Sequence, residues 1–340
     1  MPVVLITPEP MLRQRQGPHV KMLEETGFQI VYPQDPTFTR GLMSPQQTRE
    51  QLSVCDAVIA GGERFSRDVL AGLPRLRVIA RLGVGYERVD IAAATECGIA
   101  VTITPTANHE AVAEHTLMLL LAVAKRLPFG QRALRSGKWP MQSTRPVRRT
   151  TLGILGLGRI GRSLAIRARA LGMTVIATEP APDAAFVRQQ GLELVDFDAL
   201  LARADHLSIH CPLNEATRGL FNAAALARMK PGSVLINAAR GGLVVERDLI
   251  ASIESGHLAG AGLDCFEQEP PSPSNRLFEM DQVVCTPHIA ANDTLSQFDM
   301  AIEAARCIKR LYQGQWPRGA VVNDELQDRF KWLPVGAMRR

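Results

Sequence analysis

Three side chains in the C-terminal half of the chain could together act on a small oxo acid. They are Arg240, Glu269 and His288. A guanidinium can bind a carboxylate through paired hydrogen bonds, an imidazole can donate or accept a proton near neutral pH, and a carboxylate can orient that imidazole. Each residue alone could be an ordinary loop charge. Because each follows a predicted strand, and ligands of open α/β sheets bind at the carboxyl ends of strands, we expect the three to form one catalytic site.

A glycine-rich segment indicates a dinucleotide site. It follows a predicted strand, Leu152–Leu155, and opens a predicted helix. Gly156 would permit the tight turn, Gly158 would let a pyrophosphate approach the backbone, and Gly161 would allow close packing of the helix on the strand. The pyrophosphate would then rest on the positive N-terminus of the helix. The residues expected to form this cofactor loop are Gly156, Gly158, Arg159, Ile160 and Gly161.

An acidic residue completes this fingerprint. Glu179 follows the next predicted strand, Met173–Thr178, eighteen residues after Gly161. A carboxylate there can accept hydrogen bonds from the adenine ribose hydroxyls. The glycines alone could form a turn of any α/β fold, but strand, helix and acid at these spacings favour a dinucleotide. The carboxylate would repel the 2′-phosphate of NADP, and no arginine follows directly, so we expect NAD as the cofactor.

The chain alternates short β-branched runs with amphipathic stretches, which predicts parallel sheets flanked by helices. In the first hundred residues the predicted strands are Val3–Ile6, Phe28–Tyr32, Ala57–Ala60, Val78–Arg81 and Ala100–Ile103. In a second series they are Leu152–Leu155, Met173–Thr178, His206–His210, Ser233–Asn237, Gly260–Leu263 and Val283–Thr286. The second series matches a complete doubly wound nucleotide-binding domain. A buried helix is expected between the two series, at Glu110–Lys125, and an amphipathic helix after them, at Asp293–Tyr312.

Length and composition bound the class of protein. A chain of 340 residues with 46% hydrophobic and 21% charged residues is typical of a globular protein of two domains. Its six cysteines have no metal-ligand spacing, which favours free thiols, no metal site and a cytoplasmic location. The net charge of +5 is spread along the chain, and the most apolar run, Leu117–Ala124, is far short of the ~20 residues that cross a bilayer. We therefore expect neither nucleic acid nor a membrane as a partner.

Several motifs resemble those of the D-isomer-specific 2-hydroxyacid dehydrogenase family, over roughly residues 50 to 323. The matching stretches are Arg81–Asp90, Val112–Glu114, Ser136–Trp139, the glycine segment, His210–Leu213, Asn237–Gly241, Asp264–Pro270 and Thr286–Ile289. The resemblance implies two doubly wound α/β domains, with a Rossmann NAD-binding domain (104–288) inserted into a smaller flavodoxin-like substrate domain (1–103 and 289–340). It also implies hydride transfer between NAD(H) and a small D-2-hydroxy acid or 2-oxo acid, in a cleft that closes by hinge motion.

The resemblance further implies a role for each site residue. His288 would be the general acid in reduction of the oxo acid and the base in the reverse reaction. Glu269 would raise the pKa of His288 and fix its ring, and Arg240 would bind the substrate carboxylate and carbonyl oxygen. Val84 and Gly85 would hold the carboxylate from the smaller domain. The residues expected to line the cofactor site, besides the glycine loop and Glu179, are Thr104, Cys211, Pro212, Ala238, Asp264 and His288.

Two further expectations concern the rest of the chain. His115, His206 and His210 are interpreted as structural histidines. The helix at Glu110–Lys125 and the segment Arg126–Arg149 resemble the dimer interface of family members, so a homodimer is expected.

Two kinds of acid are compatible with these residues. Arg81 stands where phosphoglycerate dehydrogenases carry a phosphate-binding arginine, although it could instead form a surface salt bridge. Ala60 replaces a second basic residue of those enzymes, and Glu87-Arg88 replaces the usual Asp-Asn of the family. Both 3-phosphoglycerate and a short acid such as glyoxylate or hydroxypyruvate are therefore candidates.

Proteins of the same fold can have other functions. An NAD-sensing corepressor would be a binding protein, and the retention of Arg240, Glu269 and His288 disfavours it. A phosphite-type hydride donor enzyme is a further alternative. The formate branch carries Gln where Glu269 stands and is disfavoured for that reason.

Overall fold

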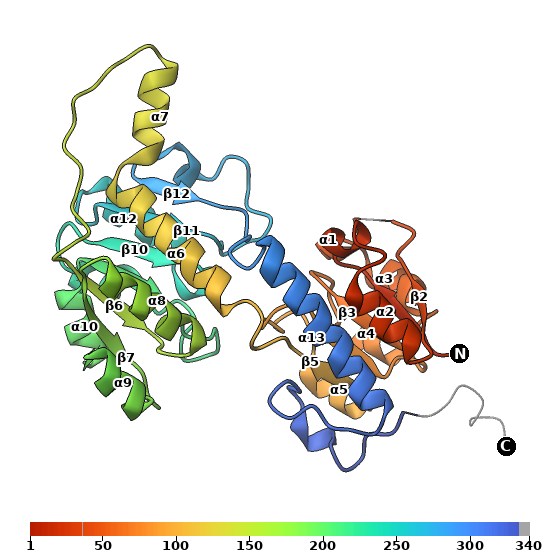
Figure 1. Ribbon diagram of the computed structural model, residues 1–340. Coiled ribbons are helices and arrows are strands. Elements are labelled where there is room, and N and C mark those ends of the chain that lie inside the picture. Colours follow the sequence, from red (N-terminus) through yellow and green to blue (C-terminus); the bar gives the residue numbers. More distant parts are fainter. Residues whose placement is uncertain (36, 333–340) are drawn as a thin grey trace. The chain divides into compact units, whose positions relative to one another are not determined.

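The computed structural model describes residues 1–35 and 37–332 and divides the chain into two compact units (Figure 1). Unit 1 combines Met1–Asn108 with the chain from Thr294 onward, and unit 2 is the continuous stretch His109–Asp293. Residues 333–340, which the predicted substrate domain includes, lie outside the described residues. Among the described helices, none is both long and apolar enough to cross a membrane.

Unit 1 is built on a five-stranded parallel sheet in the order β2-β1-β3-β4-β5. Its strands are β1 (Val3–Ile6), β2 (Gln29–Val31), β3 (Ala57–Ala60), β4 (Val78–Arg81) and β5 (Ala100–Thr102). Its helices are α1 (Glu9–Leu12), α2 (Pro18–Glu25), α3 (Pro45–Leu52), α4 (Arg67–Ala71), α5 (Ile91–Glu96) and α13 (Thr294–Tyr312). Apolar residues of α2 and α13 form one buried cluster with the sheet, and those of α3, α4 and α5 form another. This strand order is the flavodoxin-like doubly wound arrangement, which confirms the predicted fold class.

Unit 2 is built on a seven-stranded parallel sheet in the order β12-β11-β10-β9-β6-β7-β8. Its strands are β6 (Thr151–Leu155), β7 (Thr174–Thr178), β8 (Glu193–Leu194), β9 (His206–Ile209), β10 (Val234–Asn237), β11 (Gly260–Leu263) and β12 (Val283–Cys285). Its helices are α6 (His109–Ala124), α7 (Leu127–Arg135), α8 (Arg159–Ala170), α9 (Ala184–Gln190), α10 (Phe197–Arg203), α11 (Ala223–Arg228) and α12 (Glu246–Glu254). The order reverses between β6 and β9, as in a Rossmann fold, and this agrees with the prediction.

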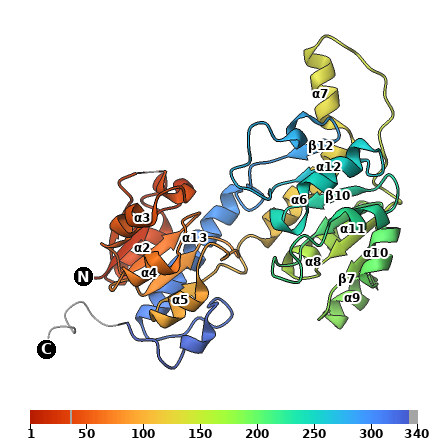
Figure 2. The ribbon, with the colours of Figure 1, turned by 180° about the vertical axis from the view of Figure 1, so that it is seen from behind.

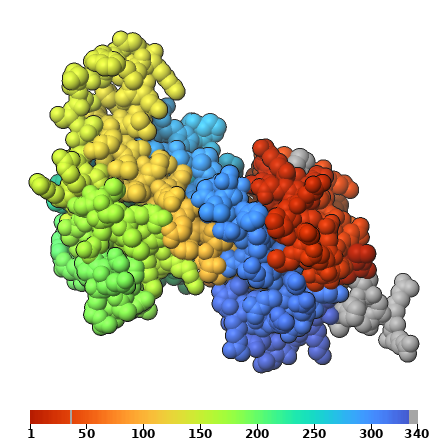
Figure 3. Space-filling view, in the orientation of Figure 1, coloured from red at the N-terminus to blue at the C-terminus, as the bar shows by residue number. Residues whose placement is uncertain are grey.

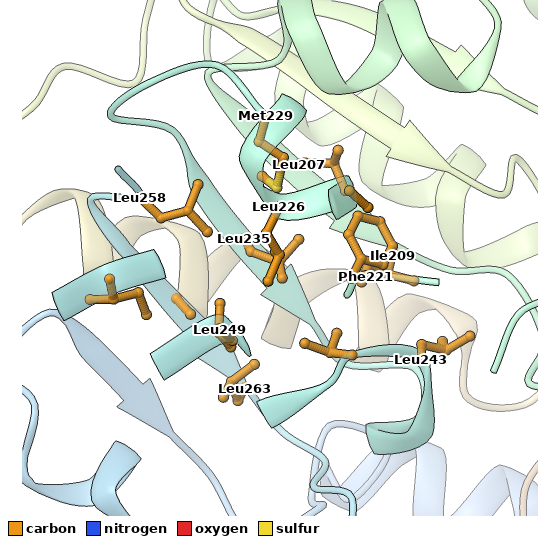
Figure 4. Close-up of a cluster of buried hydrophobic side chains, with 14 of the residues drawn as sticks. Leu207, Ile209, Phe221, Leu226, Met229, Leu235, Leu243, Leu249, Leu258 and Leu263 are labelled. Atoms are coloured by element: carbon orange, nitrogen blue, oxygen red, sulfur yellow. The ribbon is translucent and has the colours of Figure 1, made fainter. Parts of the chain in front are cut away.

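Two apolar clusters hold the helices of unit 2 to the faces of its sheet. Residues of α6 and α8 belong to one cluster, and residues of α10, α11 and α12 belong to the other; α10 and α11 can be followed from behind in Figure 2. Figure 4 shows part of the second cluster, where Phe221 lies among Leu207, Ile209 and Leu226. Phe221 is fully buried and meets the ring of Phe197 edge-on at 5.9 Å. Rigid packing of this kind fixes the strand ends from which the site loops leave.

The segment that follows α6 protrudes from unit 2. Helix α7 and the chain after it extend from the rest of unit 2 (Figures 1 and 3), until Arg145 returns to the end of α6 and donates its N–H to Ala124 O (3.1 Å). No helix is predicted here from the sequence, because the stretch is rich in Arg, Pro and Gly. Pro128 nevertheless occupies one of the first positions of α7, where a missing N–H costs nothing.

The C-terminal part of unit 1 closes the edge of its sheet at β5. Val322 N–H donates to Val101 O (2.8 Å) and Ile103 N–H donates to Ala320 O (2.9 Å). The fully buried Asn323 side chain accepts from Val101 N–H (2.9 Å) and donates to Ile99 O (2.9 Å). One amide side chain thus satisfies backbone groups more than two hundred residues away along the chain.

We expect Asn323→Ala to destabilise unit 1 by about 1–3 kcal/mol, because buried backbone groups lose their partners. Urea unfolding followed by amide hydrogen exchange should show the loss in β5 and not in the sheet of unit 2. The exposed Gln313→Ala is the control and should leave both units unchanged. Equal stability of the two variants would show that Asn323 contributes nothing to closing this edge.

Candidate active site

The three predicted catalytic residues leave neighbouring strands of unit 2 at the same edge of the sheet. Arg240 follows β10, Glu269 follows β11 and His288 follows β12. Because β10, β11 and β12 are adjacent and parallel, their carboxyl ends lie side by side. Topology alone therefore brings together residues that the chain separates by dozens of positions.

His288 and Glu269 form a direct pair. His288 Nδ1 lies 2.8 Å from Glu269 Oε2 and 2.9 Å from Oε1. The backbone N–H of Phe266 donates to Glu269 Oε1 (3.1 Å), which restrains the carboxylate. A carboxylate only accepts hydrogen bonds, so Nδ1 carries a proton and Nε2 is the ring nitrogen available to a ligand. The His288 side chain is 47% exposed, as a group that exchanges protons with a substrate must be.

The loop of Arg240 is braced by a neighbouring amide and by a close backbone contact. Asn237 donates from its side chain to Arg240 O (2.9 Å) and accepts from Ala239 N–H (3.0 Å). A Cβ on Gly241 would collide with the backbone of Phe266. Since Phe266 N–H also holds Glu269, the Arg240 loop and the Glu269 loop are packed directly on each other.

Asp264 fixes the loop that carries His288. Its buried carboxylate accepts from Ile289 N–H (2.9 Å), Ala290 N–H (2.8 Å) and the Thr286 hydroxyl (2.6 Å). Burial favours the neutral acid, but a hydrogen bond from His115 together with these three outweighs it and keeps the pKa of Asp264 below its ordinary value. His288 has a left-handed backbone (φ +54°), which is costly for a residue with a side chain. The bonds to the next two N–H groups hold it in that conformation.

The glycine loop lies at the point where the strand order of unit 2 reverses. Gly156 follows β6 with φ +97°, and a Cβ there would lie 2.7–2.8 Å from backbone atoms of His210 and Cys211. Cys211 and Pro212 follow β9, so the loops after β6 and β9 are in contact. A dinucleotide binds at such a switch point in doubly wound sheets.

Helix α8 starts within the glycine loop. Gly158 is its N-cap, Arg159 and Ile160 are its first residues, and a Cβ on Gly161 would collide with the carbonyl oxygen of Gly156. Glu179 follows β7 and accepts from the Leu157 N–H (2.8 Å). The carboxylate therefore stands beside the loop that would receive the adenosine.

These residues fit a dinucleotide. A Cβ on Gly158 would meet nothing within 4 Å, so the backbone at the start of α8 has open space beside it. Free N–H groups and the helix dipole at this end favour a phosphate. Ala238, at the end of β10, shares the same edge of the sheet.

Unit 1 holds the remaining predicted residues. Val84 and Gly85 lie on the loop after β4, and Arg81 Nε donates to Gly85 O (3.2 Å). Gly83 N–H donates to the hydroxyl of the fully buried Thr104 (2.8 Å), and Thr104 N–H donates to Gly83 O (2.9 Å). Arg81 is only 8% exposed, so it is not a surface side chain. Both Arg81 and Thr104 brace the loop that is predicted to hold the substrate carboxylate.

Of the three histidines interpreted as structural, His206 is buried and His210 is half-buried. Burial lowers the pKa of His206 to about 4 and that of His210 to about 4, so both are neutral at physiological pH. His115 is different, because its Nε2 lies 2.9 Å from the Thr286 hydroxyl in the His288 loop.

Sequence reasoning missed the residues that brace this site. These residues act through contacts between loops that are distant in the chain: the close approach at Gly241, the amide of Asn237 and the hydroxyl of Thr286. No local sequence pattern indicates such contacts. The part of the chain that the structure describes contains no group of three or more His, Cys, Asp or Glu side chains placed to hold a metal ion.

Comparison with known proteins places this chain in a family. Residues 117–290 match the NAD-binding domain of the D-isomer specific 2-hydroxyacid dehydrogenases. A solved structure from Thermus thermophilus is 33% identical, with a TM-score of 0.81 over 94% of this chain and 99% of that one. The chain belongs to the D-isomer specific 2-hydroxyacid dehydrogenase family. The predicted family and the NAD-binding domain are thereby confirmed.

Proteins similar to this chain are named as enzymes with different substrates. The D-3-phosphoglycerate dehydrogenase of Mycobacterium leprae is 39% identical over 88% of this chain and 58% of that protein. The chain thus spans little more than half the length of this relative. A glyoxylate reductase from Paecilomyes thermophila is 28% identical, with a TM-score of 0.81 over 95% of this chain and 99% of that one.

Substitutions at two glycines of the cofactor loop should separate an effect on stability from an effect on NADH binding. We expect Gly161→Ala to destabilise unit 2 by about 1–3 kcal/mol, because its Cβ overpacks the turn at Gly156. Gly158→Ala should leave the melting temperature nearly unchanged, since its Cβ meets open space, but should weaken NADH binding at least tenfold by blocking the pyrophosphate. Calorimetry without cofactor and NADH fluorescence titration measure the two effects. Normal NADH affinity in Gly158→Ala would place the pyrophosphate elsewhere.

Proposed function

We propose that the chain is an NAD-dependent dehydrogenase that moves a hydride between NAD(H) and the C2 carbon of a small D-2-hydroxy acid or 2-oxo acid. The observation that carries this proposal is the His288–Glu269 pair, with 2.8 Å between Nδ1 and Oε2. The pair and the glycine loop leave the same edge of one parallel sheet. A proton donor and a dinucleotide loop at one edge are what reduction of a carbonyl requires.

Each residue has one proposed task. In reduction, His288 Nε2 donates a proton to the carbonyl oxygen, and in the reverse direction it takes the proton from the hydroxyl. Glu269 accepts from Nδ1 and stabilises the imidazolium form. Arg240 binds the substrate carboxylate and carbonyl oxygen, where negative charge develops. The bound nicotinamide supplies or accepts the hydride.

The cofactor and substrate assignments rest on particular side chains. Glu179 would repel a 2′-phosphate, which supports NAD over NADP. Val84 and Gly85, braced by Arg81 and Thr104, are proposed to hold the substrate carboxylate. The named substrates of the relatives support two candidates, 3-phosphoglycerate and a short acid such as glyoxylate or hydroxypyruvate.

We further propose a homodimer formed through α6 and the protruding segment that begins with α7. Three of its apolar side chains are strongly exposed: Leu134 (57%), Trp139 (81%) and Met141 (92%). Apolar side chains gathered on a protruding segment lose contact with water most simply by packing on another chain. The proposed location is the cytoplasm, which the free thiols of all six cysteines support.

A panel of acids tests the proposed reaction. We expect turnover of at least one of glyoxylate, hydroxypyruvate or 3-phosphoglycerate with NAD(H), followed at the nicotinamide absorbance, and slower turnover with NADP(H). His288→Ala should lower kcat about a hundredfold or more, because the general acid is lost. His257→Ala, whose ring bonds to Leu226 O, is the matched control. Unchanged activity in His288→Ala would remove this residue from the mechanism.

Sedimentation velocity tests the proposed dimer. The double change Trp139→Glu and Met141→Glu should shift the protein from dimer to monomer while each chain stays folded, because both side chains are exposed in the single chain. Leu194→Asp, at an exposed position of β8, should leave the dimer intact. A wild-type chain that sediments as a monomer would refute the proposal.

A further inference from the structure

One buried cluster beneath the His288 loop has a member that the proposed mechanism does not use. His115 lies on α6, and its Nε2 is 2.9 Å from the Thr286 hydroxyl and 3.4 Å from Asp264 Oδ1. Its side chain is only 15% exposed. Helix α6 packs directly on β11 and β12, the strands that end at Asp264 and at the Thr286 loop.

The donor and acceptor of each hydrogen bond in this cluster can be assigned. The Asp264 carboxylate is ionised and can only accept, so the single hydroxyl proton of Thr286 points to Asp264 Oδ1 (2.6 Å). The Thr286 oxygen must then accept from His115, which places a proton on His115 Nε2. A chain of donors therefore runs from His115 through Thr286 to Asp264.

The same carboxylate receives the backbone of the catalytic loop. Ile289 N–H donates to Asp264 Oδ1 (2.9 Å) and Ala290 N–H donates to Oδ2 (2.8 Å). These are the two N–H groups that follow His288, whose φ is +54°. Oδ1 thus collects donors from the His288 loop and from α6. Without the donor from α6, the carboxylate would be held only by the loop that it restrains, and the strained His288 backbone would lose part of its restraint.

We propose that His115 is a positioning residue for catalysis, which orients Thr286 and Asp264 from α6 and through them fixes the His288 backbone in its left-handed conformation. The proposal rests on the proposed function, since it assigns His115 to the proton-transfer step of that reaction. His115 touches neither substrate nor cofactor in this role. It acts on kcat through the placement of the imidazole.

Paired substitutions separate hydrogen bonding from packing. His115→Leu removes the donor and keeps much of the volume, whereas His115→Gln can return an N–H near the position of Nε2. We expect His115→Leu to lower kcat about tenfold or more, since small displacements of a catalytic group are costly. His115→Gln should stay within about threefold of wild type. KM for the oxo acid and the Kd for NADH should change less than about twofold in both.

A neighbouring residue provides the matched control. Thr116 is fully buried on the same helix, but its hydroxyl bonds to Val112 O within α6 (2.7 Å). Thr116→Val should leave kcat unchanged even if it alters the melting temperature. The double variant His115→Leu with Thr286→Val should be no slower than the worse single variant, because both act through the same carboxylate.

Hydrogen exchange tests the positioning role independently of turnover. In His115→Leu the amides of Ile289 and Ala290 should exchange at least tenfold faster than in wild type, and in Thr116→Val they should not. If wild type turns over none of the acids, the proposed function fails, and this exchange result still decides the role of His115. Unchanged exchange and unchanged kcat in His115→Leu would overturn the inference. A loss of NADH affinity with normal kcat would also overturn it, since the cluster would then serve the cofactor.

Discussion

The site depends on a buried carboxylate that must remain ionised. Asp264 loses hydration when β11 carries it into the edge of the sheet, and it is stable there only because backbone and side-chain donors surround it. Those donors belong to the loop after β12 and to α6, so satisfying one charge ties three elements together. Because the His288 loop supplies some of these donors, the hydrogen bonds to Asp264 also fix the backbone of His288. Glu269 then orients its ring.

Parallel sheets explain why the remaining groups gather at one edge. In unit 2 the carboxyl ends of β6 and β9 flank the point of reversal and carry the glycine loop and Cys211-Pro212, while β10, β11 and β12 carry the reactive side chains. Unit 1 repeats the principle with other residues, because Thr104 and Arg81 brace a glycine-rich loop after β4. The strand order thus positions both the cofactor-binding residues and the acid–base residues, and local hydrogen bonds then fix their orientation.

Particular residues show what the sequence can and cannot predict. The strands were predictable because runs such as Val3–Ile6 are continuously apolar and rich in β-branched residues, and the cofactor loop was predictable because its glycines have fixed spacing. Strand β8 has two residues, both exposed, and is too short to show an apolar pattern, and α7 was obscured by Pro128 and Gly130. The roles of Asp264 and His115 depend on contacts with Thr286 and its neighbours across a fold. Such contacts leave no periodicity along the chain.

The closure of β5 by Asn323 has a consequence for synthesis on the ribosome. The first hundred residues emerge early, but their sheet edge and one of its faces are completed only by α13 and by the strand-like segment at 320–323. Unit 2 is continuous in the chain and can fold as soon as it has left the exit tunnel. The nascent N-terminal portion must therefore wait, with an apolar face unprotected, until translation has passed through the whole of the intervening unit. Chaperones that bind exposed apolar segments would act during that delay.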